Sequence, residues 1–468
     1  MHRYTPAPMP APLYLPVENQ VRELDAKILF ACIAASRGLP TVLGFKPYLY
    51  FAMPRLAPGI FIAKSMRAGS RLMFDIMRGL GQRLVAWDEE SLVRYASPEY
   101  YAWRFSAATF APLEALYAWG HDDAEMFRAY PGNPGIDVRE TGNPRVDLLR
   151  PELRDYFAPA AQALRDRYGD FVLVNTNFSF VNPFLAAQAL VLPADAQGRR
   201  RASRTAAGMS DDFALGMAAH QQHIFEAFRA LLPRLAARFP GHTIVLRPHP
   251  SENHALWTKL LGDHTNVVVA HEGNVIPWLM ACRVLLHNGC TTAVEGALLE
   301  RPAISYRPLR SAVYDYALPN SLSHEADDID TVLELTAEIV DGRRGTVADA
   351  QRSEVLARHL ASVDGALASR RIVDHLLALD SRAPAPAPHW SRARARLVAT
   401  ARTALKRVNM QRRHHWASRR YLEHIYPEIA LDDVRSRIER LDGLLGGFAD
   451  LRVERVSRFL FRVAPRAA

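Results

Sequence analysis

The chain has 468 residues, 49% of them hydrophobic, and a net charge of +9, which is typical of a globular protein with two or three domains. Its cysteines lack the paired spacing of metal ligands, which argues against a disulfide framework and a zinc site and fits a reducing cytosol. No apolar run approaches the roughly 20 residues needed to span a bilayer, and the proline-rich start lacks the layout of a signal peptide. We therefore expect a cytoplasmic protein, soluble or peripheral on a membrane.

The positive charge is concentrated at the C-terminal end. From Ser391 onward the sequence holds 18 Lys and Arg against 8 Asp and Glu, whereas the rest of the chain is nearly balanced. The body shows no basic groove interleaved with aromatic residues, so nucleic acid is not an expected partner. An anionic lipid surface is the expected partner of this basic tail.

Short apolar segments alternate with helical stretches along most of the chain. In the first part, strands are predicted at 13–17, 41–45, 59–63, from 85 and from 116, with helices at 22–37 and 70–80. In the second part, strands are predicted at 171–177, from 243, at 267–270, 284–286 and 303–306. This alternation is typical of parallel α/β sheets. We predict two doubly wound, Rossmann-like domains at 12–150 and 151–380.

Two segments interrupt this pattern. Residues 194–212 carry several arginines, including Arg204, without an apolar period, and are expected to form an exposed loop. The alternating Ala-Pro run within 381–390 predicts a stiff linker before a basic tail at 391–468. Within the tail, 390–416 and 431–463 are predicted to be amphipathic helices. These helices either bind the membrane or pack back on the two domains as the closing element of the fold.

Polar residues gather after two strands of the second domain. In an open parallel sheet, ligands bind beyond the carboxyl ends of the strands, where helix N-termini favour phosphate. A nucleotide or phosphate site is therefore predicted. Its residues follow the strands that start near 243 and 283: Arg247, His249, Ser251, Asn288, Gly289, Thr291, Thr292 and Glu295.

His249 lies between two prolines, so its imidazole is held on a rigid turn, where it can protonate or hydrogen-bond a leaving phosphate oxygen. The alternative is a structural histidine that donates a hydrogen bond to a neighbouring carbonyl.

In the second turn, Gly289 permits close approach of the backbone to a ligand, and Glu295 can accept hydrogen bonds from ribose hydroxyls. Alternatively, Thr291 or Thr292 simply caps a helix.

Three consecutive carboxylates, at 88–90, follow a strand of the first domain. Repulsion between like charges raises the pKa of one of them, so Glu89 or Glu90 is a candidate general base for an acceptor hydroxyl. Alternatively, the three carboxylates form the solvent-exposed start of a helix, where acidic residues are common.

In the second domain, Asn175 and Asn177 are expected to line the cleft and Asn274 to contact a base edge, although all three are also ordinary turn residues.

Several of these runs, in this order, resemble the two-domain GT-B architecture: 141–147, the Arg-Pro-His-Pro turn at 247–250 and the helix start at 287–295. More narrowly, 13–25, 87–90 and 247–252 resemble the bacterial surface carbohydrate biosynthesis proteins, a group found with polysaccharide and lipopolysaccharide assembly. The resemblance covers about 12–323 and does not reach the tail. It implies a glycosyltransferase of lipopolysaccharide or capsule assembly, peripheral on the inner face of the bacterial inner membrane.

Neighbouring families suggest roles for single residues. Bacterial sialyl- and polysialyltransferases use an acidic pair before Gly, a His-Pro pair and a Ser/Thr motif, which resemble 89–90, 249–250 and 291–292 here. Ser91 stands where their Gly is. The CDP-glycerol glycerophosphotransferases have a similar His-Pro turn. The UDP-N-acetylglucosamine 2-epimerases share the Thr-Gly-Asn run and the helix-start Glu, but their Gly-Thr-Arg signature is missing from this sequence.

These features together predict a metal-independent glycosyltransferase without a cofactor beyond its nucleotide-sugar co-substrate. A CMP-activated ulosonic acid, such as sialic acid or Kdo, is one candidate donor, a UDP-hexose is another, and the acceptor is a glycan or glycolipid. One alternative is an epimerase or hydrolase that acts on the sugar nucleotide alone. Another is a non-catalytic assembly protein of the same fold, which Ser91 favours.

Overall fold

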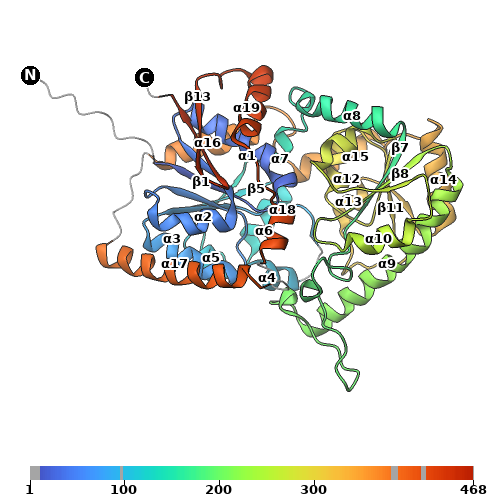
Figure 1. Ribbon diagram of the computed structural model, residues 1–468, viewed down its shortest axis with the longest axis horizontal. Coiled ribbons are helices and arrows are strands. Elements are labelled where there is room, and N and C mark those ends of the chain that lie inside the picture. Colours follow the sequence, from blue (N-terminus) through green and yellow to red (C-terminus); the bar gives the residue numbers. More distant parts are fainter. Residues whose placement is uncertain (1–10, 95–97, 381–387, 413–417, 467–468) are drawn as a thin grey trace, which may run out of the picture.

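The computed structural model describes residues 11–94, 98–380, 388–412 and 418–466. Figure 1 shows two lobes side by side, each built around one β-sheet. This arrangement confirms the two Rossmann-like domains predicted from the alternation of strands and helices.

The first sheet has eight strands in the order β13-β14-β2-β1-β3-β4-β5-β6. Strands β1 to β6 are parallel, and β14 pairs antiparallel with β2. The strands are β1 (Leu13–Val17), β2 (Thr41–Phe45), β3 (Ile60–Ala63), β4 (Arg83–Trp87), β5 (Ala115–Ala118), β6 (Asp137–Glu140), β13 (Leu451–Ser457) and β14 (Leu460–Pro465).

The second sheet has six parallel strands in the order β12-β11-β10-β7-β8-β9. Because its strands are covered by helices on both faces, most read as continuous apolar runs in the sequence. The strands are β7 (Phe171–Thr176), β8 (Thr243–Pro248), β9 (Val267–Val269), β10 (Val284–His287), β11 (Ala303–Tyr306) and β12 (His324–Ala326).

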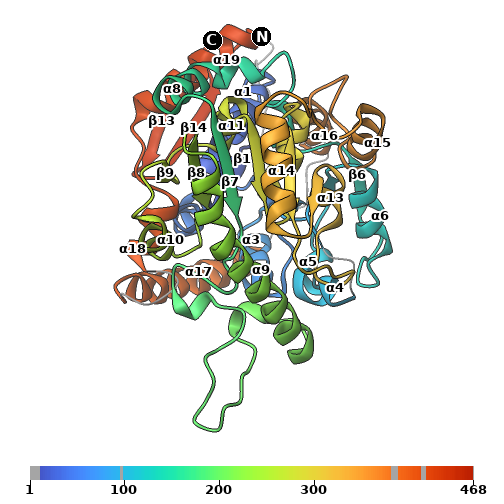
Figure 2. The same ribbon diagram turned by 90° about the vertical axis from the view of Figure 1, so that its right-hand side faces the viewer.

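Helices cover both faces of each sheet, as Figure 2 shows for the second domain. The first domain contains α1 (Gln20–Ser36), α2 (Lys46–Ala52), α3 (Arg71–Gly79), α4 (Pro98–Arg104), α5 (Ala107–Phe110), α6 (His121–Ala129) and α7 (Pro144–Asp147). The second part of the chain adds α8 (Ala158–Tyr168), α9 (Asp211–Arg238), α10 (His254–Leu261), α11 (Val275–Ala281), α12 (Thr292–Leu298), α13 (Ala317–Ser321), α14 (Ile329–Val340), α15 (Asp349–His359) and α16 (Ala368–Asp380).

Helix α1 is the central helix of the molecule. Its 17 residues are buried almost all round, so its sequence lacks the polar stripe of a surface helix. It packs against α7, α16 and α19, and its apolar side chains belong to a hydrophobic cluster that extends into the second domain. Helix α16 falls in the range expected for the second domain, yet it packs on α1 and α7 and so returns the chain to the first domain.

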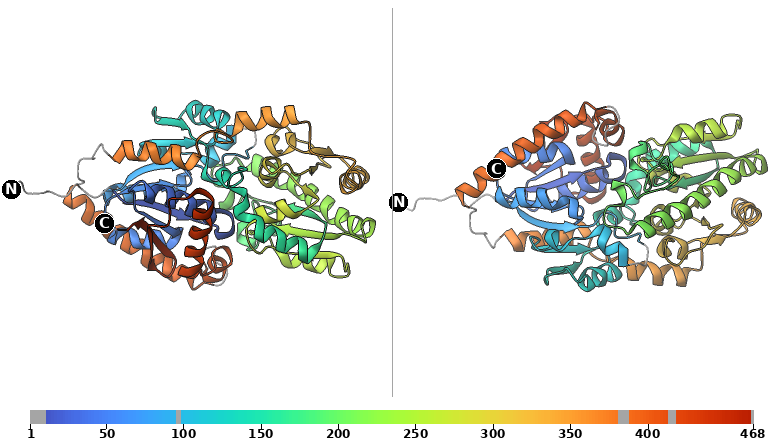
Figure 3. Two further views of the ribbon diagram at one scale, coloured as in Figure 1. Left: turned by 90° about the horizontal axis from the view of Figure 1, so that it is seen from above. Right: turned by 90° about the horizontal axis from the view of Figure 1, so that it is seen from below.

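The C-terminal segment forms α17 (His389–Met410), α18 (Arg419–Ile425), α19 (Leu431–Leu445) and the hairpin β13-β14. The expected helix at 431–463 is therefore wrong beyond residue 445. Phe459, Leu460 and Phe461 are buried at or next to β14, where the hairpin extends the first sheet, and α17 packs on α2 and α3 (Figure 3). This segment closes the fold of the first domain. The expected linker at 381–390 lies mostly outside the described residues.

Candidate active site in the interdomain cleft

The two sheets place their topological switch points toward one cleft. In the second sheet the chain runs from β7 to β8 and β9 on one side, then returns to β10, β11 and β12 on the other. In the first sheet, β2 lies on one side of β1 and β3 on the other. Ligands of open parallel sheets bind beyond the carboxyl ends of the strands at such points. Glu18 after β1, Lys64 after β3 and Asn175 on β7 all line this cleft.

The cleft has a volume of about 1170 Å³ and a positive lining. Ten Lys and Arg side chains line it against four Glu, and they come from both domains and from the C-terminal segment. The basic lining residues are Arg22, Lys46, Lys64, Arg67, Arg104, Arg145, Arg204, Arg247, Arg402 and Lys406. Clefts lined by one sign of charge concentrate ligands of the opposite sign, so this cleft suits an anion.

His249 is held at the end of β8 by a network centred on Glu252. The fully buried Glu252 carboxylate accepts hydrogen bonds from the backbone N–H groups of His249 and Phe178 and from the Thr176 hydroxyl. It thereby ties the turn after β8 to the turn after β7. Burial raises the pKa of Glu252, while these hydrogen bonds oppose that rise. In the sequence Glu252 comes three residues after His249, but only the structure shows that it positions this histidine.

The imidazole of His249 has a defined tautomer. Its Nδ1 accepts a hydrogen bond from the Ser251 backbone N–H at 3.2 Å, so a neutral ring carries its proton on Nε2. Burial, together with the nearby charge of Arg22, lowers the pKa of His249 to about 4. The ring is therefore neutral near pH 7 and is a hydrogen-bond donor rather than a cationic acid. The tyrosine and histidine of α18, Tyr421 and His424, brace the same turn through Ser251 and Pro250.

Asn175 provides a polar atom without a partner in the cleft. Its side chain is 4% exposed, and Oδ1 makes no hydrogen bond to any described residue. Such buried polar atoms are uncommon in native proteins and call for a ligand, ion or water. Asn177 and Asn288 differ from it. The side-chain amide of Asn288 accepts a hydrogen bond from the backbone N–H of Asn177 and donates one to its C=O, which links two loops. Asn177 lines the cleft and Asn288 does not.

Two other expected donor-binding residues are engaged in holding the site. The Arg247 guanidinium donates to the carbonyls of Glu272 and Gly273 and stacks over Trp278 at 4.7 Å. Burial lowers its pKa to about 10. The Asn274 amide donates to Asp25 at 3.0 Å, while its Oδ1 caps α11. Both side chains line the cleft, but their polar atoms already fix the loop after β9.

The turn before α12 brings Thr291, Thr292 and Glu295 to the cleft wall. Thr292 contacts the Cys290 sulfur through its hydroxyl, and Thr291 does not cap the helix with its side chain. Glu295 is paired with Arg145 at 2.5 Å. Gly289 does not line the cleft. Its φ of +84° accounts for glycine there, since a Cβ would meet nothing closer than 3.6 Å.

The neighbouring carboxylates after β4 differ completely in environment. Glu89 is buried, accepts from the Trp87 indole at 2.8 Å and lies 3.0 Å from Lys27, so it points away from the cleft. Glu90 lines the cleft and is paired with Arg22 at 2.8 Å. The structure therefore favours Glu90 over Glu89 as the candidate base. Ser91, where the resembled families have Gly, donates its hydroxyl to the Asp88 carbonyl and closes this turn.

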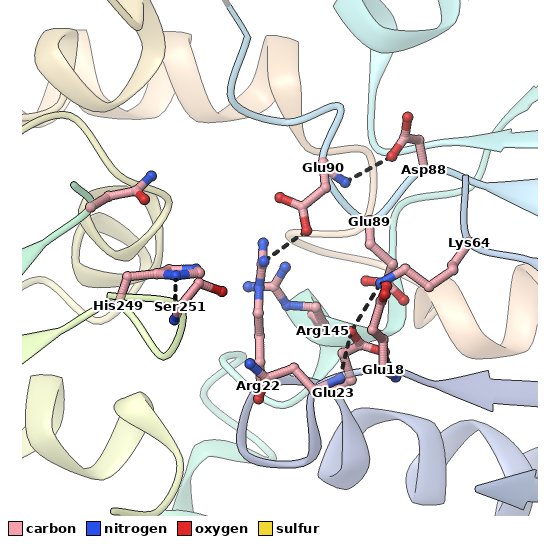
Figure 4. A network of polar contacts seen from close by, with 12 residues as sticks. Glu18, Arg22, Glu23, Lys64, Asp88, Glu89, Glu90, Arg145, His249 and Ser251 are labelled. Carbon is pink, nitrogen blue, oxygen red and sulfur yellow. Dashed lines mark hydrogen bonds and ion pairs between the residues drawn. The ribbon is translucent and has the colours of Figure 1, made fainter. Parts of the chain in front are cut away.

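Figure 4 shows Glu90 and Arg22 on one side of the cleft facing His249 and Ser251 on the other. Burial works to raise the pKa of Glu90, but the charges of Arg22, Lys64 and two further arginines outweigh it and lower that pKa. Behind this pair, Lys64 lies close to Glu18 and Glu23. Ion pairs with Lys46 and Lys64 outweigh burial and hold the pKa of Glu18 near 2.

Several charged residues of the first domain line the cleft without belonging to a recognisable site motif, among them Arg22, Lys64, Arg104 and Arg145. One signal was available: Glu18 and Lys64 each follow the last residue of a parallel strand, which is where ligands bind. The C-terminal segment was also missed as part of the site. Arg402, Lys406 and Tyr421 all line the cleft.

Comparison with known proteins places the fold. No protein-family model matches the chain, and neither does any curated protein. A structure of the wall teichoic acid polymerase TagF soaked with CDPG superposes with a TM-score of 0.50 and 11% identity, over 80% of this chain and 89% of that one. The fold is GT-B.

Two further similar structures contain UDP or UDP-GlcNAc. MnaA from S. aureus with UDP has a TM-score of 0.47 and 12% identity, over 80% of this chain and 99% of that one. A UDP-GlcNAc 2-epimerase from Neisseria meningitidis bound to UDP-GlcNAc has a TM-score of 0.45 and 11% identity, over 78% and 99%. At these identities a likeness describes the fold alone, so a function for this GT-B chain must be argued from its own cleft.

Proposed function

We propose that this chain is a glycosyltransferase that transfers a sugar from a nucleotide-activated donor to an acceptor of a bacterial surface glycan. The observation that carries this proposal is a pair of buried polar atoms without partners among the described residues. Both Asn175 Oδ1 and Arg145 Nη1 belong to residues that line the cleft. One acceptor and one cationic donor, beside a histidine with its Nε2–H available, suit a ligand with both hydroxyls and phosphates.

In the proposed reaction, an acceptor hydroxyl oxygen attacks the anomeric carbon while the bond from that carbon to the phosphate oxygen breaks. Glu90 takes the hydroxyl proton, and the nucleotide leaves with the bonding electrons. His249 donates a hydrogen bond from Nε2 to the departing phosphate, and Arg22 lies between the two groups to stabilise the charge. Glu295 and Thr291 are proposed to contact the nucleotide.

We further propose that transfer is metal-independent. Ten Lys and Arg side chains line the cleft, and preorganised cations can stabilise a leaving phosphate without reorganisation during the reaction, which supports this proposal. Activity is expected to persist after treatment with EDTA. A strict requirement for an added divalent ion would contradict this part of the proposal.

The donor is open to direct test. Melting temperature should be measured with CMP-, CDP-, UDP- and GDP-linked sugars, since a ligand that binds the native state raises it. The proposal includes CMP-ulosonic acids as a donor class, to be compared with UDP-hexoses. We expect one nucleotide class to stabilise the protein and Asn175→Ala to reduce that shift. If no class stabilises the protein, the proposed function is wrong, and turnover of a donor without acceptor would favour an epimerase or hydrolase.

We also propose that the enzyme is cytoplasmic and peripheral on the inner membrane, with α17 as the membrane-facing element. Among the described residues, no helix is long and apolar enough to cross a bilayer. Helix α17 has six Lys and Arg and no acidic residue, and its outer face carries Trp390, Leu397 and Leu405, which are 63–72% exposed. A basic helix with an exposed apolar face is typical of binding in the interface of an anionic membrane.

A further inference from the structure

A second cluster of cations lines the cleft where α2 and α17 contact each other. We call Lys46, Arg204, Arg402 and Lys406 the basic corner. Lys46 comes from α2, Arg204 from the segment before α9, and the other two from α17. All four line the same cleft as His249 and Glu90.

The members of the basic corner lie close to one another. Lys46 and Arg402 both lie over the ring of Tyr50, at 6.0 and 5.6 Å from its centre. Burial and the positive charges of its three neighbours in the corner together lower the pKa of Lys406 to about 8. Three segments that are distant in sequence therefore bring like charges together at one place.

Carboxylates are sparse around three members of the corner, Lys46, Arg204 and Arg402, among the described residues. Lys46 lies 3.6 Å from Glu18, which also pairs with Lys64. Within the described part of the chain, no ion pair joins Arg204 or Arg402 to a carboxylate. Like charges held together in a partly buried site repel one another, and a bound anion removes that repulsion.

The cleft has room for a second ligand beside the donor. Ligand pockets commonly measure about 300–1,000 Å³, and this cleft is larger. The polar atoms assigned to the donor lie mainly at the ends of β7, β8 and β10 in the second domain. The basic corner lies mostly on the first domain, and the Lys46–Glu18–Lys64 contacts connect it to the side of the cleft that carries Glu90.

We propose that the basic corner is an acceptor subsite that binds a phosphate group carried by the acceptor. The inference rests on the proposed transferase function and specifies its substrate as an anionic, phosphate-bearing acceptor. Held there, the acceptor extends toward Glu90, with its charge neutralised by the corner and its hydroxyl near the base. A contact with the phosphate headgroups of a membrane is the other source of such a phosphate, and the vesicle measurement below distinguishes the two.

The test uses the full-length protein and its Arg402→Gln/Lys406→Gln double variant. The matched control is Arg394→Gln/Arg396→Gln, which removes the same two charges from exposed positions of α17 that do not line the cleft. Inorganic tripolyphosphate binding is measured by calorimetry. We expect the double variant to bind about tenfold or more weakly and the control to bind as the parent does. Equal affinities in all three, or an equal loss in the control, would overturn the subsite.

Three additional measurements make the result decisive. Nucleotide-induced shifts in melting temperature should be the same in parent and double variant, so failure of the donor assignment is recognised separately. Arg402→Lys keeps both charges of α17 in the corner and should retain much of the parent's affinity, which separates loss of charge from a folding defect. Binding to phosphatidylglycerol vesicles forms the lipid arm: a loss of vesicle binding with unchanged tripolyphosphate affinity would make the corner a lipid contact and overturn the acceptor subsite.

Discussion

Arg22 and Glu90 form an ion pair of 2.8 Å that faces His249 across the interdomain cleft. Arg22 belongs to the first turn of α1, and Glu90 follows β4. The pair thus combines the group proposed to take a proton with a cation next to the departing phosphate. Its charge balance sets the protonation state of Glu90.

The first prediction concerns the pH dependence of transfer. Glu90 must be ionised to act as a base, and Arg22 is the largest of the charges that lower its pKa. Removing this charge in Arg22→Gln raises the pKa of Glu90, so the acidic limb of the kcat/KM profile should move to higher pH. Arg37→Gln, at the exposed far end of the same helix, should leave the limb in place. An unchanged limb in Arg22→Gln would show that another group titrates there.

A second prediction separates the adjacent carboxylates. Glu90→Gln should retain donor binding and lose turnover by about 100-fold or more, as expected for a base. Glu89→Gln weakens a buried ion pair with Lys27 and should lower the free energy of unfolding by about 1–3 kcal/mol while the folded fraction stays active. Turnover and urea denaturation of both variants check this. Full activity in Glu90→Gln would place the base elsewhere.

For His249, the expected role is hydrogen-bond donation from Nε2. His249→Ala should fold normally and lower turnover by about 100-fold or more. His223→Ala, on the exposed face of α9, serves as the control. Because the pKa of His249 is lowered to about 4, activity should show no His249 titration between pH 6 and 8. A folded His249→Ala enzyme with parental turnover would remove this residue from the mechanism.

The hairpin β13-β14 predicts a specific requirement at Gly44 on β2. This residue has a φ of +149°, and a Cβ there would lie 2.1 Å from the Phe459 carbonyl oxygen. Gly44→Ala should therefore displace the hairpin and destabilise the protein by about 1–3 kcal/mol. Gly241→Ala, where a Cβ meets nothing within 4 Å, is the control. Equal melting temperatures of the two variants would contradict the importance of this close approach.

Membrane binding is tested by co-sedimentation with anionic and neutral liposomes at low and high salt. Truncating the tail would remove β14 from the first sheet, so point variants are required. Leu397→Ser/Leu405→Ser should reduce binding to anionic liposomes, and high salt should reduce it in the parent. Leu192→Ser/Leu309→Ser removes exposed leucines elsewhere and should have no effect. Equal, salt-insensitive binding by both pairs would show that α17 is structural only.

Much of the fold could be predicted because its signals are local. The alternation of apolar strands and helices indicated both parallel sheets, and the strand that starts at Thr243 ends at the site as expected. The C-terminal hairpin could not be predicted from its arginine-rich sequence. Residues 460–463 pair with β2 in the first sheet, and contacts of that sequence separation leave no local periodicity to recognise.

By itself, the sequence determined which residues follow the strands of the two sheets, because chain order and hydrophobic pattern fix where a parallel strand ends. It thereby predicted His249, Asn175 and the carboxylate pair Glu89 and Glu90 at strand ends. Only the tertiary structure decided their environments. Glu89 and Glu90 are neighbours in sequence, yet one is buried against Lys27 and the other is paired with Arg22 in the cleft. Burial and charge pairing depend on segments that are distant in the chain, so they emerge only when the chain folds.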